Sequence, residues 1–327
     1  MLKSLIYLSG KSMLLPLYHV VSDHDLKHIK NLYPVRNTKQ FIQDIDFILK
    51  YYKPINVDTI IESIKNGTKI KRNSVLFTFD DGLREVHDII APILKQKGIP
   101  AVFFVNSDFI DNKNLFYRYK ASLLVEEVKS KEISKSRINE ISSKLIDKPN
   151  QKNDICKSIL NINYKNKFVI DEIAKIIDYK FDEFLETNQP YLTSLQIKSL
   201  IKQGFSVGAH SIDHPEYFNI PFDEQLRQTT ESIKWIKKSF NQEYNLFAFP
   251  FTDYKVSKHF FETIYSLNNP IVDLSFACAG IKDDLYTKHL QRLPIEISNE
   301  SARQIITKEY LAYIGKCLIG KNLIRRK

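Results

Sequence analysis

Two pairs of chemically active side chains each follow an apolar run in this sequence. One run of strand-forming residues ends in the adjacent carboxylates Asp80 and Asp81 and a glycine. A second run ends at His210, and His214 follows four positions later. Residues four apart lie on one face of a helical turn, so we expect both imidazoles to hold a single ion. Two imidazoles and one carboxylate leave coordination positions open for water, which is typical of a catalytic zinc site rather than a structural one.

Apolar runs alternate with helical stretches along most of the chain. This alternation predicts an α/β fold with a parallel sheet or barrel, in which chemistry gathers at the carboxyl ends of the strands. The strands are expected at 14–18, 75–79, 101–105, 205–209, 246–249, 271–276 and 293–297, and the helices at 38–52, 86–97, 194–203 and 222–240.

The segment 107–190 interrupts this alternation. It is rich in lysine, serine, asparagine and isoleucine, and 121–128 and 168–177 have helical periodicity. We therefore expect a mostly helical insertion that forms a lid or a partner surface. The predicted organisation is a first part of the barrel at 1–106, the insertion at 107–190, a second part of the barrel at 191–300, and a basic C-terminal helix or tail at 301–327.

Composition limits the classes of function. The net charge is +10, but the lysines are interleaved with acids, which indicates a solvated surface and no nucleic-acid partner. The three widely spaced cysteines argue against a disulfide framework and against a cysteine zinc site. No convincing signal peptide or long apolar span is present, so we expect a cytoplasmic protein. The apolar and basic tail from Tyr310 onward either contacts the inner membrane surface peripherally or docks as a terminal helix.

The two motifs together resemble a known family. Phe77-Thr78-Phe79-Asp80-Asp81-Gly82 and His210-Ser211-x-x-His214 are similar to the first two motifs of the NodB-type polysaccharide deacetylases, carbohydrate esterase family four, and Leu17-Tyr18-His19-x-Val21 resembles a Tyr-His signature of many members. The resemblance implies a distorted (β/α) barrel over roughly 14–110 and 191–300. It also implies one divalent metal, with Asp81, His210 and His214 as its ligands and Asp80 as the catalytic base.

Two later motifs of that family are altered here. The third lacks its arginine and reads Phe-Ala-Phe-Pro-Phe-Thr-Asp at 247–253. Arg292, from another strand, is a candidate to orient Asp80, and a surface arginine at a strand start is the alternative. The fifth motif, usually Leu-x-His, is also changed, because His289 precedes Leu290. We favour His19 over His289 as the general acid because it follows a predicted strand, although a histidine there can also serve the core.

These residues predict a metal-dependent hydrolysis. A divalent ion, most plausibly zinc, polarises the acetyl carbonyl and acidifies water, while Asp80 accepts a proton. A backbone N–H near Phe251 is expected to help stabilise the oxyanion. The products are acetate and a free amino sugar. Aromatic residues near the site are candidates for stacking on the sugar, or else belong to the barrel core. This candidate substrate-binding set, with the proline among them, is Tyr18, Phe249, Pro250, Phe251 and Tyr254.

Two other functions remain open from the sequence. The same site would suit deacetylation or deformylation of a lipid-linked or nucleotide-linked sugar in envelope polysaccharide assembly. A non-catalytic carbohydrate-binding protein is the second alternative, but it has no need for a base beside three metal ligands. The expected partner is in each case an acetylated or otherwise acylated glycan or sugar.

Overall fold

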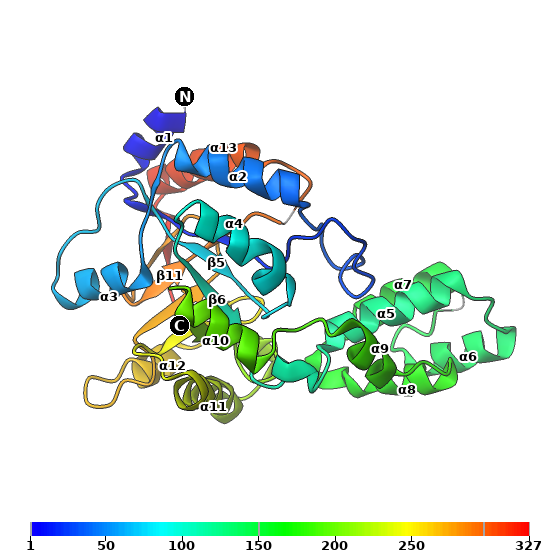
Figure 1. Ribbon diagram of the computed structural model, residues 1–327. Helices are drawn as coiled ribbons and strands as arrows, with labels where there is room; N and C mark the ends of the chain where they lie inside the picture. Colours follow the sequence, from blue (N-terminus) through cyan, green and yellow to red (C-terminus); the bar gives the residue numbers. More distant parts are fainter. Residues whose placement is uncertain (1, 150, 297, 327) are drawn as a thin grey trace.

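The computed structural model describes residues 2–149, 151–296 and 298–326 (Figure 1). Its main sheet has eight strands in the order β11-β9-β8-β7-β6-β5-β2-β12, and every neighbouring pair is parallel. These strands are β2 (Pro16–Tyr18), β5 (Phe77–Phe79), β6 (Ala101–Val105), β7 (Ser206–Ala209), β8 (Leu246–Ala248), β9 (Leu274–Ala277), β11 (His289–Gln291) and β12 (Leu293–Pro294).

One short segment joins the two edges of this sheet. β11 pairs with β9 and β12 pairs with β2, and only Arg292 separates β11 from β12 along the chain. The Arg292 amide donates to the Ala277 carbonyl at 2.8 Å, and the Leu293 amide donates to the Leu15 carbonyl at 2.8 Å. The sheet is thus nearly closed, which confirms the predicted (β/α) barrel. The last strand was expected at 293–297; β12 begins at Leu293 as predicted but ends at Pro294, β11 before it was not predicted, and Ile297 lies outside the described residues.

The register of the parallel strands brings polar residues to one end of the barrel. β2 pairs with β5, β5 with β6, and β6 with β7, in each case up to or near the last residue of both strands. The strand residues themselves are buried and apolar almost throughout, because each strand is enclosed on both faces. The residues that follow these four strands are His19, Asp80, Asn106 and His210.

A glycine allows close packing inside the barrel. A Cβ atom on Gly208, in β7, would lie 2.6 Å from Cε1 of Phe104 and 2.9 Å from Cβ of Leu246. A larger residue there would push β7 away from the strands on either side. The close approach keeps the end of β7, and with it His210, beside β6 and β8.

Helices cover the outside of the barrel (Figure 1). Capping boxes begin two of them, with Asn37 before α2 and Thr193 before α10, and the left-handed Asn241 ends α11. These local signals explain why the predicted helix starts at residues 38 and 194 and the predicted helix end at residue 240 agree with the structure. The covering helices are α2 (Thr38–Leu49), α3 (Val57–Lys65), α4 (Ala91–Gln96, after a π-helical turn at Val86–Ile90), α10 (Ser194–Lys202), α11 (Phe222–Phe240) and α12 (Lys258–Ile264).

The first and last helices lie on the side of the barrel that α2 covers (Figure 1). Helix α1 (Leu2–Ser9) packs on α13 (Ala302–Leu318), which in turn packs on α2. Two small parallel sheets complete this region: β1 (Met13–Leu14) with β4 (Ser74–Val75) and β3 (Lys53–Pro54), and β10 (Asp283–Asp284) with β13 (Leu323–Ile324). Among the described residues, no helix has both the length and the apolar character needed to cross a membrane.

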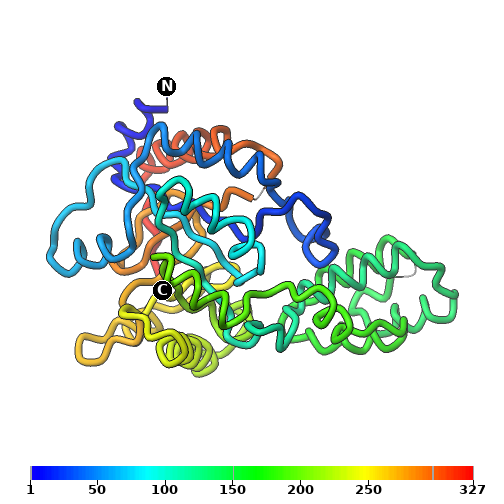
Figure 2. The backbone as a smooth tube through the Cα atoms, in the orientation of Figure 1, coloured from blue at the N-terminus to red at the C-terminus, as the bar shows by residue number. Residues whose placement is uncertain are grey.

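The segment between β6 and β7 forms a helical arm beside the barrel (Figure 1). It has its own apolar core, which includes Leu124 and Val128 of α5. A loop at residues 22–36 runs along the start of the arm (Figure 2), where Asn31 Nδ2 donates to Glu126 Oε1 at 2.9 Å. The arm contains α5 (Tyr117–Ser130), α6 (Lys135–Lys144), α7 (Lys152–Leu160), α8 (Phe168–Ile176) and α9 (Phe181–Asn188), with short 3₁₀ turns at Ile110–Asn112 and Tyr164–Asn166.

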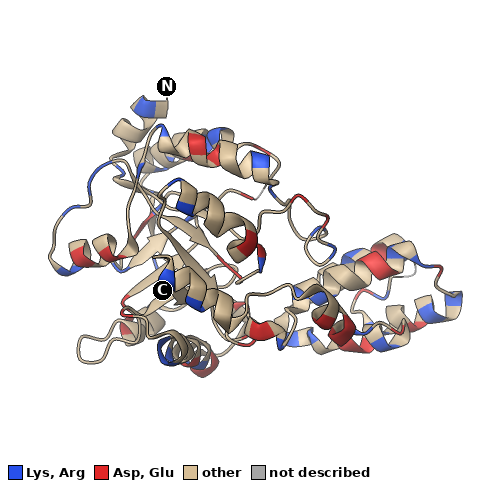
Figure 3. Ribbon diagram, viewed as in Figure 1, with Lys and Arg blue, Asp and Glu red and all other residues tan. Residues whose placement is uncertain are grey.

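Charged residues of both signs alternate over the barrel helices and the arm (Figure 3). Many of them form exposed ion pairs, such as Lys97 with Asp46 and Arg137 with Asp178. Exposed pairs of this kind contribute little stability and keep the surface solvated.

Candidate active site

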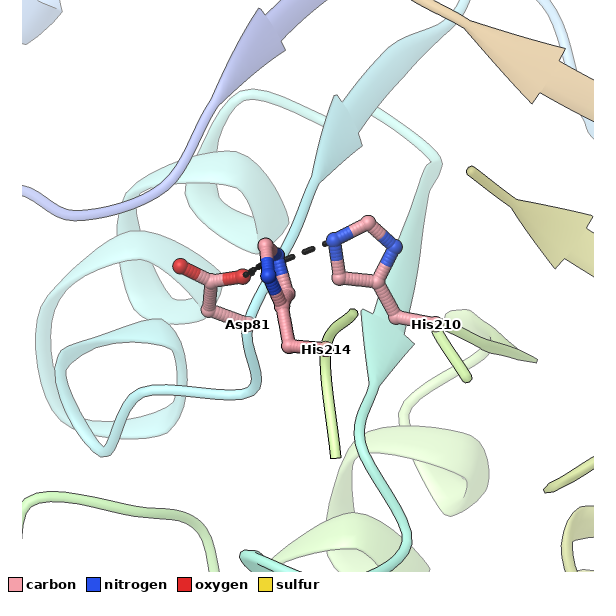
Figure 4. Close-up of side chains that lie close together, drawn as sticks. All are labelled: Asp81, His210 and His214. Carbon is pink, nitrogen blue, oxygen red and sulfur yellow. Dashed lines mark ion pairs between the residues drawn. The ribbon is translucent and has the colours of Figure 1, made fainter. Parts of the chain in front are cut away.

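Three predicted metal ligands converge at the carboxyl end of the barrel (Figure 4). Asp81 Oδ1 lies 3.2 Å from His214 Nε2 and 3.5 Å from His210 Nε2, and all three residues are buried. Asp81 Oδ1 is fully buried and has no hydrogen-bond partner within the described chain. A buried carboxylate oxygen facing two imidazole nitrogens is costly unless a cation binds it. This donor set therefore fits a divalent ion, and zinc matches its mixture of nitrogen and oxygen ligands.

Hydrogen bonds behind the ligands fix their orientation. His210 Nδ1 donates to the Ala248 carbonyl at 2.9 Å, so its Nε2 carries the lone pair that faces Asp81. The other oxygen of Asp81 accepts a hydrogen bond from the Tyr119 hydroxyl at 2.7 Å. Both ligands are thus held in position by groups that would not touch the metal.

The local backbone is left-handed at several positions around the site. Asp81, Ser211 and His214 have φ values of 71°, 68° and 61°. Such φ values are uncommon outside glycine and cluster at functional sites. His210 and His214 therefore do not lie on a helical turn, as their spacing predicted, but on an irregular loop that brings their ring centroids within 4.8 Å. Gly82 has φ 65°, and a Cβ there would meet Val105 Cγ1 at 2.9 Å, so only glycine fits.

Arg292 binds the candidate base directly. Its Nη1 and Nη2 donate to the two oxygens of Asp80 at 2.6 and 2.7 Å, and both side chains are almost completely buried. The alternative of a surface arginine is therefore wrong. Burial raises the pKa of Asp80, but the charges of Arg292 and His210 outweigh burial and hold that pKa below its usual value. Asp80 is accordingly an ionised, oriented carboxylate whose Oδ2 lies 3.7 Å from His210 Nε2.

His19 also lies in the site and has a buried carboxylate partner. Glu296 Oε2 lies 3.0 Å from His19 Nδ1 and accepts from the His19 amide at 2.6 Å, while Oε1 accepts from the Val20 amide at 3.3 Å. Burial lowers the pKa of His19, but the hydrogen bond to Glu296 and the charges of Asp81 and Asp80 outweigh it and raise the pKa to about 9. The arrangement leaves Nε2 of a protonated imidazole as the free donor.

A pocket of about 340 Å³ surrounds these groups. Asp80, Asp81, His210, His214, His19 and Arg292 all line it. Apolar side chains supply most of its remaining wall, a composition typical of sites that bind small organic groups. They are Leu17, Leu32, Tyr33, Phe116, Phe249, Phe251 and Pro294.

Comparisons with known proteins agree with this geometry. The sequence model of the polysaccharide deacetylase family matches residues 67–260, more than half of the chain. The chain belongs to this family. It is therefore a deacetylase, a hydrolase of carbon–nitrogen bonds other than peptide bonds. The match includes Asp80, Asp81, His210 and His214 but ends before Arg292. A comparison with curated protein sequences gives no significant match.

Solved structures share the fold of this deacetylase at low sequence identity. The Streptococcus pyogenes deacetylase PplD, in complex with acetate, has a TM-score of 0.57 and 15% identity, covering 91% of this chain and 97% of PplD. IcaB from Ammonifex degensii has a TM-score of 0.56 and 14% identity, covering 92% and 98%. A de-N-acetylase from Aggregatibacter actinomycetemcomitans has a TM-score of 0.54 and 15% identity, covering 90% and 99%.

The second candidate acid of the deacetylase lies in a different cluster. His289 Nε2 is 3.0 Å from Asp253 Oδ2, and its Nδ1 contacts the Ser275 hydroxyl. His289 does not line the pocket described above, whereas His19 does. Asp253 and Asp284 also bind the guanidinium of Arg326, whose side chain is only 4% exposed. Because Arg326 already supplies the positive charge, we do not interpret this group as a second metal site.

The cluster of Asp253, Asp284, His289 and Arg326 also shows where the C-terminal tail lies. The tail docks through α13 and β13, and Arg326 is buried against Asp253. Arg325 is exposed, and Lys327 lies outside the described residues. Contact of the tail with an anionic membrane remains a prediction, and Arg326 is not available for it.

The predicted substrate-binding residues have different surroundings. Phe251 is 36% exposed and lines the pocket, and Phe249 lines it while being almost fully buried. Tyr18 is completely buried and stacks on Phe79, so it offers no face to a sugar. Pro250 is buried and does not line the pocket. Tyr254 is 65% exposed and also lies outside the pocket lining.

The helical arm supplies parts of the site that the sequence did not reveal. Phe116 packs on His214 with ring centroids 4.4 Å apart, and Tyr119 binds Asp81. Neither residue stands in a motif, so no local signal marks it. Glu296 was also missed, because the predicted strand at 293–297 placed it inside a strand, whereas β12 ends at Pro294 and leaves Glu296 beyond the strand end.

Proposed function

We propose that this deacetylase uses a divalent metal, most plausibly zinc, to remove acetyl groups from an acetylated glycan. The observation that carries the proposal is the buried, unpartnered Oδ1 of Asp81 facing Nε2 of both His210 and His214. Burying this oxygen without a hydrogen-bond partner is costly, and a cation between the three side chains would offset that cost. When bound, the metal would polarise the acyl carbonyl and acidify a water molecule.

The residues around the ligands have separate roles in this proposal. Asp80 accepts the proton of the attacking water as general base, and Arg292 holds its carboxylate in one orientation. His19, protonated and fixed by Glu296, donates a proton to the departing sugar amine or hydroxyl. The amide of Phe251 makes no hydrogen bond within the described chain and lies at the pocket wall, which supports a role in stabilising the oxyanion.

The same residues and the size of the pocket discriminate between the alternative functions. A binding protein gains nothing from a buried arginine that locks a carboxylate beside the ligands, so Arg292 favours an enzyme. A lipid-linked or nucleotide-linked sugar remains a second candidate substrate. The pocket volume of about 340 Å³ is near the lower limit for ligand sites and suits one sugar residue better than a long polymer segment.

Acetate release and metal content test the proposal together. Zinc-loaded protein would be assayed for acetate release from N-acetylated and O-acetylated sugars and for formate release from N-formylated sugars, beside Asp80→Asn and the surface control Asp46→Asn. We expect Asp80→Asn to retain its metal and lose at least about 100-fold in kcat, the scale of one general base. Asp46→Asn should match the wild type. The proposal would be contradicted if Asp80→Asn were as active as the wild type, or if the metal-free wild type were as active as the zinc-loaded protein.

A further inference from the structure

Arg118 enters the active-site pocket from the helical arm. It is the second residue of α5, between two residues that are fixed to the candidate metal ligands. Phe116 packs on His214, and Tyr119 donates to Asp81. These neighbouring contacts hold the backbone of Arg118 at the pocket wall, so its position does not depend on a flexible loop.

The other cationic groups of the pocket are already paired. Arg292 binds Asp80, and His19 binds Glu296. Within the described residues, Arg118 has no carboxylate oxygen within 4.0 Å and donates no hydrogen bond to the protein. It is only partly buried, so its guanidinium is accessible from the pocket.

The charges of the pocket leave room for a negative ligand. The carboxylate of Asp80 faces Arg292 and that of Asp81 faces the two imidazoles, so the guanidinium of Arg118 is a positive charge that no described carboxylate of the pocket neutralises. A divalent metal would add two further positive charges. In a largely apolar pocket, this excess is poorly solvated and favours a ligand that carries an anionic group.

We propose that Arg118 binds an oxyanion substituent, a carboxylate or a phosphate, on the sugar whose acyl group is removed. This inference rests on the proposed function and specifies its substrate. Guanidinium groups recognise carboxylate and phosphate through two parallel hydrogen bonds, a geometry that lysine cannot reproduce. A neutral acetylated glycan would leave Arg118 without a partner. The substituent is a uronate carboxylate in a glycan or the phosphate of an activated sugar, two sources of the same oxyanion chemistry.

Equilibrium binding separates this inference from catalysis. Metal-free full-length protein, which keeps the pair of Asp80 with Arg292 and does not turn over, would be titrated calorimetrically with N-acetylglucosamine, its 1-phosphate, and the corresponding N-acetylated uronic acid. We expect one of the charged sugars to bind about 10- to 100-fold more tightly than the neutral sugar, as for a hydrogen bond to a charged group. Adding Arg118→Gln should abolish that preference and leave binding of the neutral sugar unchanged. The charged sugar that is preferred identifies the source of the oxyanion.

Two further variants guard against a trivial result. Arg118→Lys should retain only part of the preference, because it keeps the charge but not the planar fork. Arg303→Gln, an exposed arginine on α13, should retain all of it. Equal binding of charged and neutral sugars, or a preference that survives Arg118→Gln, would overturn the inference. Failure of the wild type to release acetate from any sugar would instead refute the proposed function, since the binding result does not depend on turnover.

Discussion

Replacing Glu296 with glutamine should move the pH at which the proposed general acid loses its proton. Glu296 is 4% exposed and contacts both the ring and the backbone amide of His19. Glutamine keeps the size, and its amide oxygen can still accept both hydrogen bonds from His19, but it carries no charge and its NH2 group cannot accept the longer bond from the Val20 amide. The substitution therefore removes the electrostatic support of a protonated His19 while preserving the packing around it.

The size of the effect follows from the pKa of His19. That pKa is raised from 6.5 to about 9 against the opposing effect of burial, with Glu296, Asp81 and Asp80 as the causes. Loss of one of the three charges and of the stronger hydrogen bond should lower it by about one to two units, or about 1.4 to 2.7 kcal/mol. Since a general acid must be protonated, activity declines as pH rises through this pKa. In a plot of activity against pH, the decline on the alkaline side should thus appear one to two pH units lower in Glu296→Gln than in the wild type. This decline is called the alkaline limb.

The assay is the pH dependence of kcat/KM for acetate release, measured with both proteins loaded with the same metal. A bound cation lowers the pKa of His19 in both proteins, so the difference between them is the quantity tested. Glu300→Gln, which changes a neighbouring surface carboxylate, is the matched control and should not move the limb. An alkaline limb at the same pH in Glu296→Gln and wild type would refute the pairing of Glu296 with the general acid.

Three further substitutions test the groups behind the site. Arg292→Lys should reduce kcat about 10-fold or more at unchanged metal content, because one ammonium cannot hold both oxygens of Asp80. Stopped assays with metal analysis would measure this effect. An unchanged kcat would argue against an orienting role of Arg292. Tyr119→Phe should weaken metal affinity about 10-fold by removing the hydrogen bond to Asp81, as competition with a chelator would show; equal affinity would contradict that role. Arg326→Ala should lower the free energy of unfolding, measured with denaturant, by about 3 to 5 kcal/mol, because it leaves the buried carboxylates of Asp253 and Asp284 without this cation. A loss below about 1 kcal/mol would contradict the burial of these ion pairs.

The barrel and its strand ends could be predicted from the sequence because contiguous apolar runs mark both of them. Strands β5 to β7 coincide with apolar runs, and each run stops where the polar residue begins. Parallel strands enclosed on both faces must be apolar along their length, so Asp80 and His210 stand out as the first residues beyond them. The helix starts were equally local, since a capping residue such as Asn37 is adjacent to the helix that it begins.

Features that depend on distant pairing or on backbone strain could not be read in the same way. The spacing of His210 and His214 suggested a helical turn, but the left-handed Ser211 and His214 make a loop instead, and no spacing rule encodes that choice. Tyr18 and His19 are adjacent in the sequence, yet the first belongs to the core and the second to the pocket, because β2 ends between them.

The arm shows how far such distant pairing determines the site. Tyr119 reaches Asp81 across 38 positions, and Lys167 forms an ion pair with Asp213, beside the ligand His214, at 2.6 Å. The loops that carry the candidate ligands are therefore each held by the arm as well as by the barrel. Backbone conformations as unfavourable as those of the site persist only when several contacts enforce them. The arm is thus better understood as part of the framework of the active site than as a separate lid.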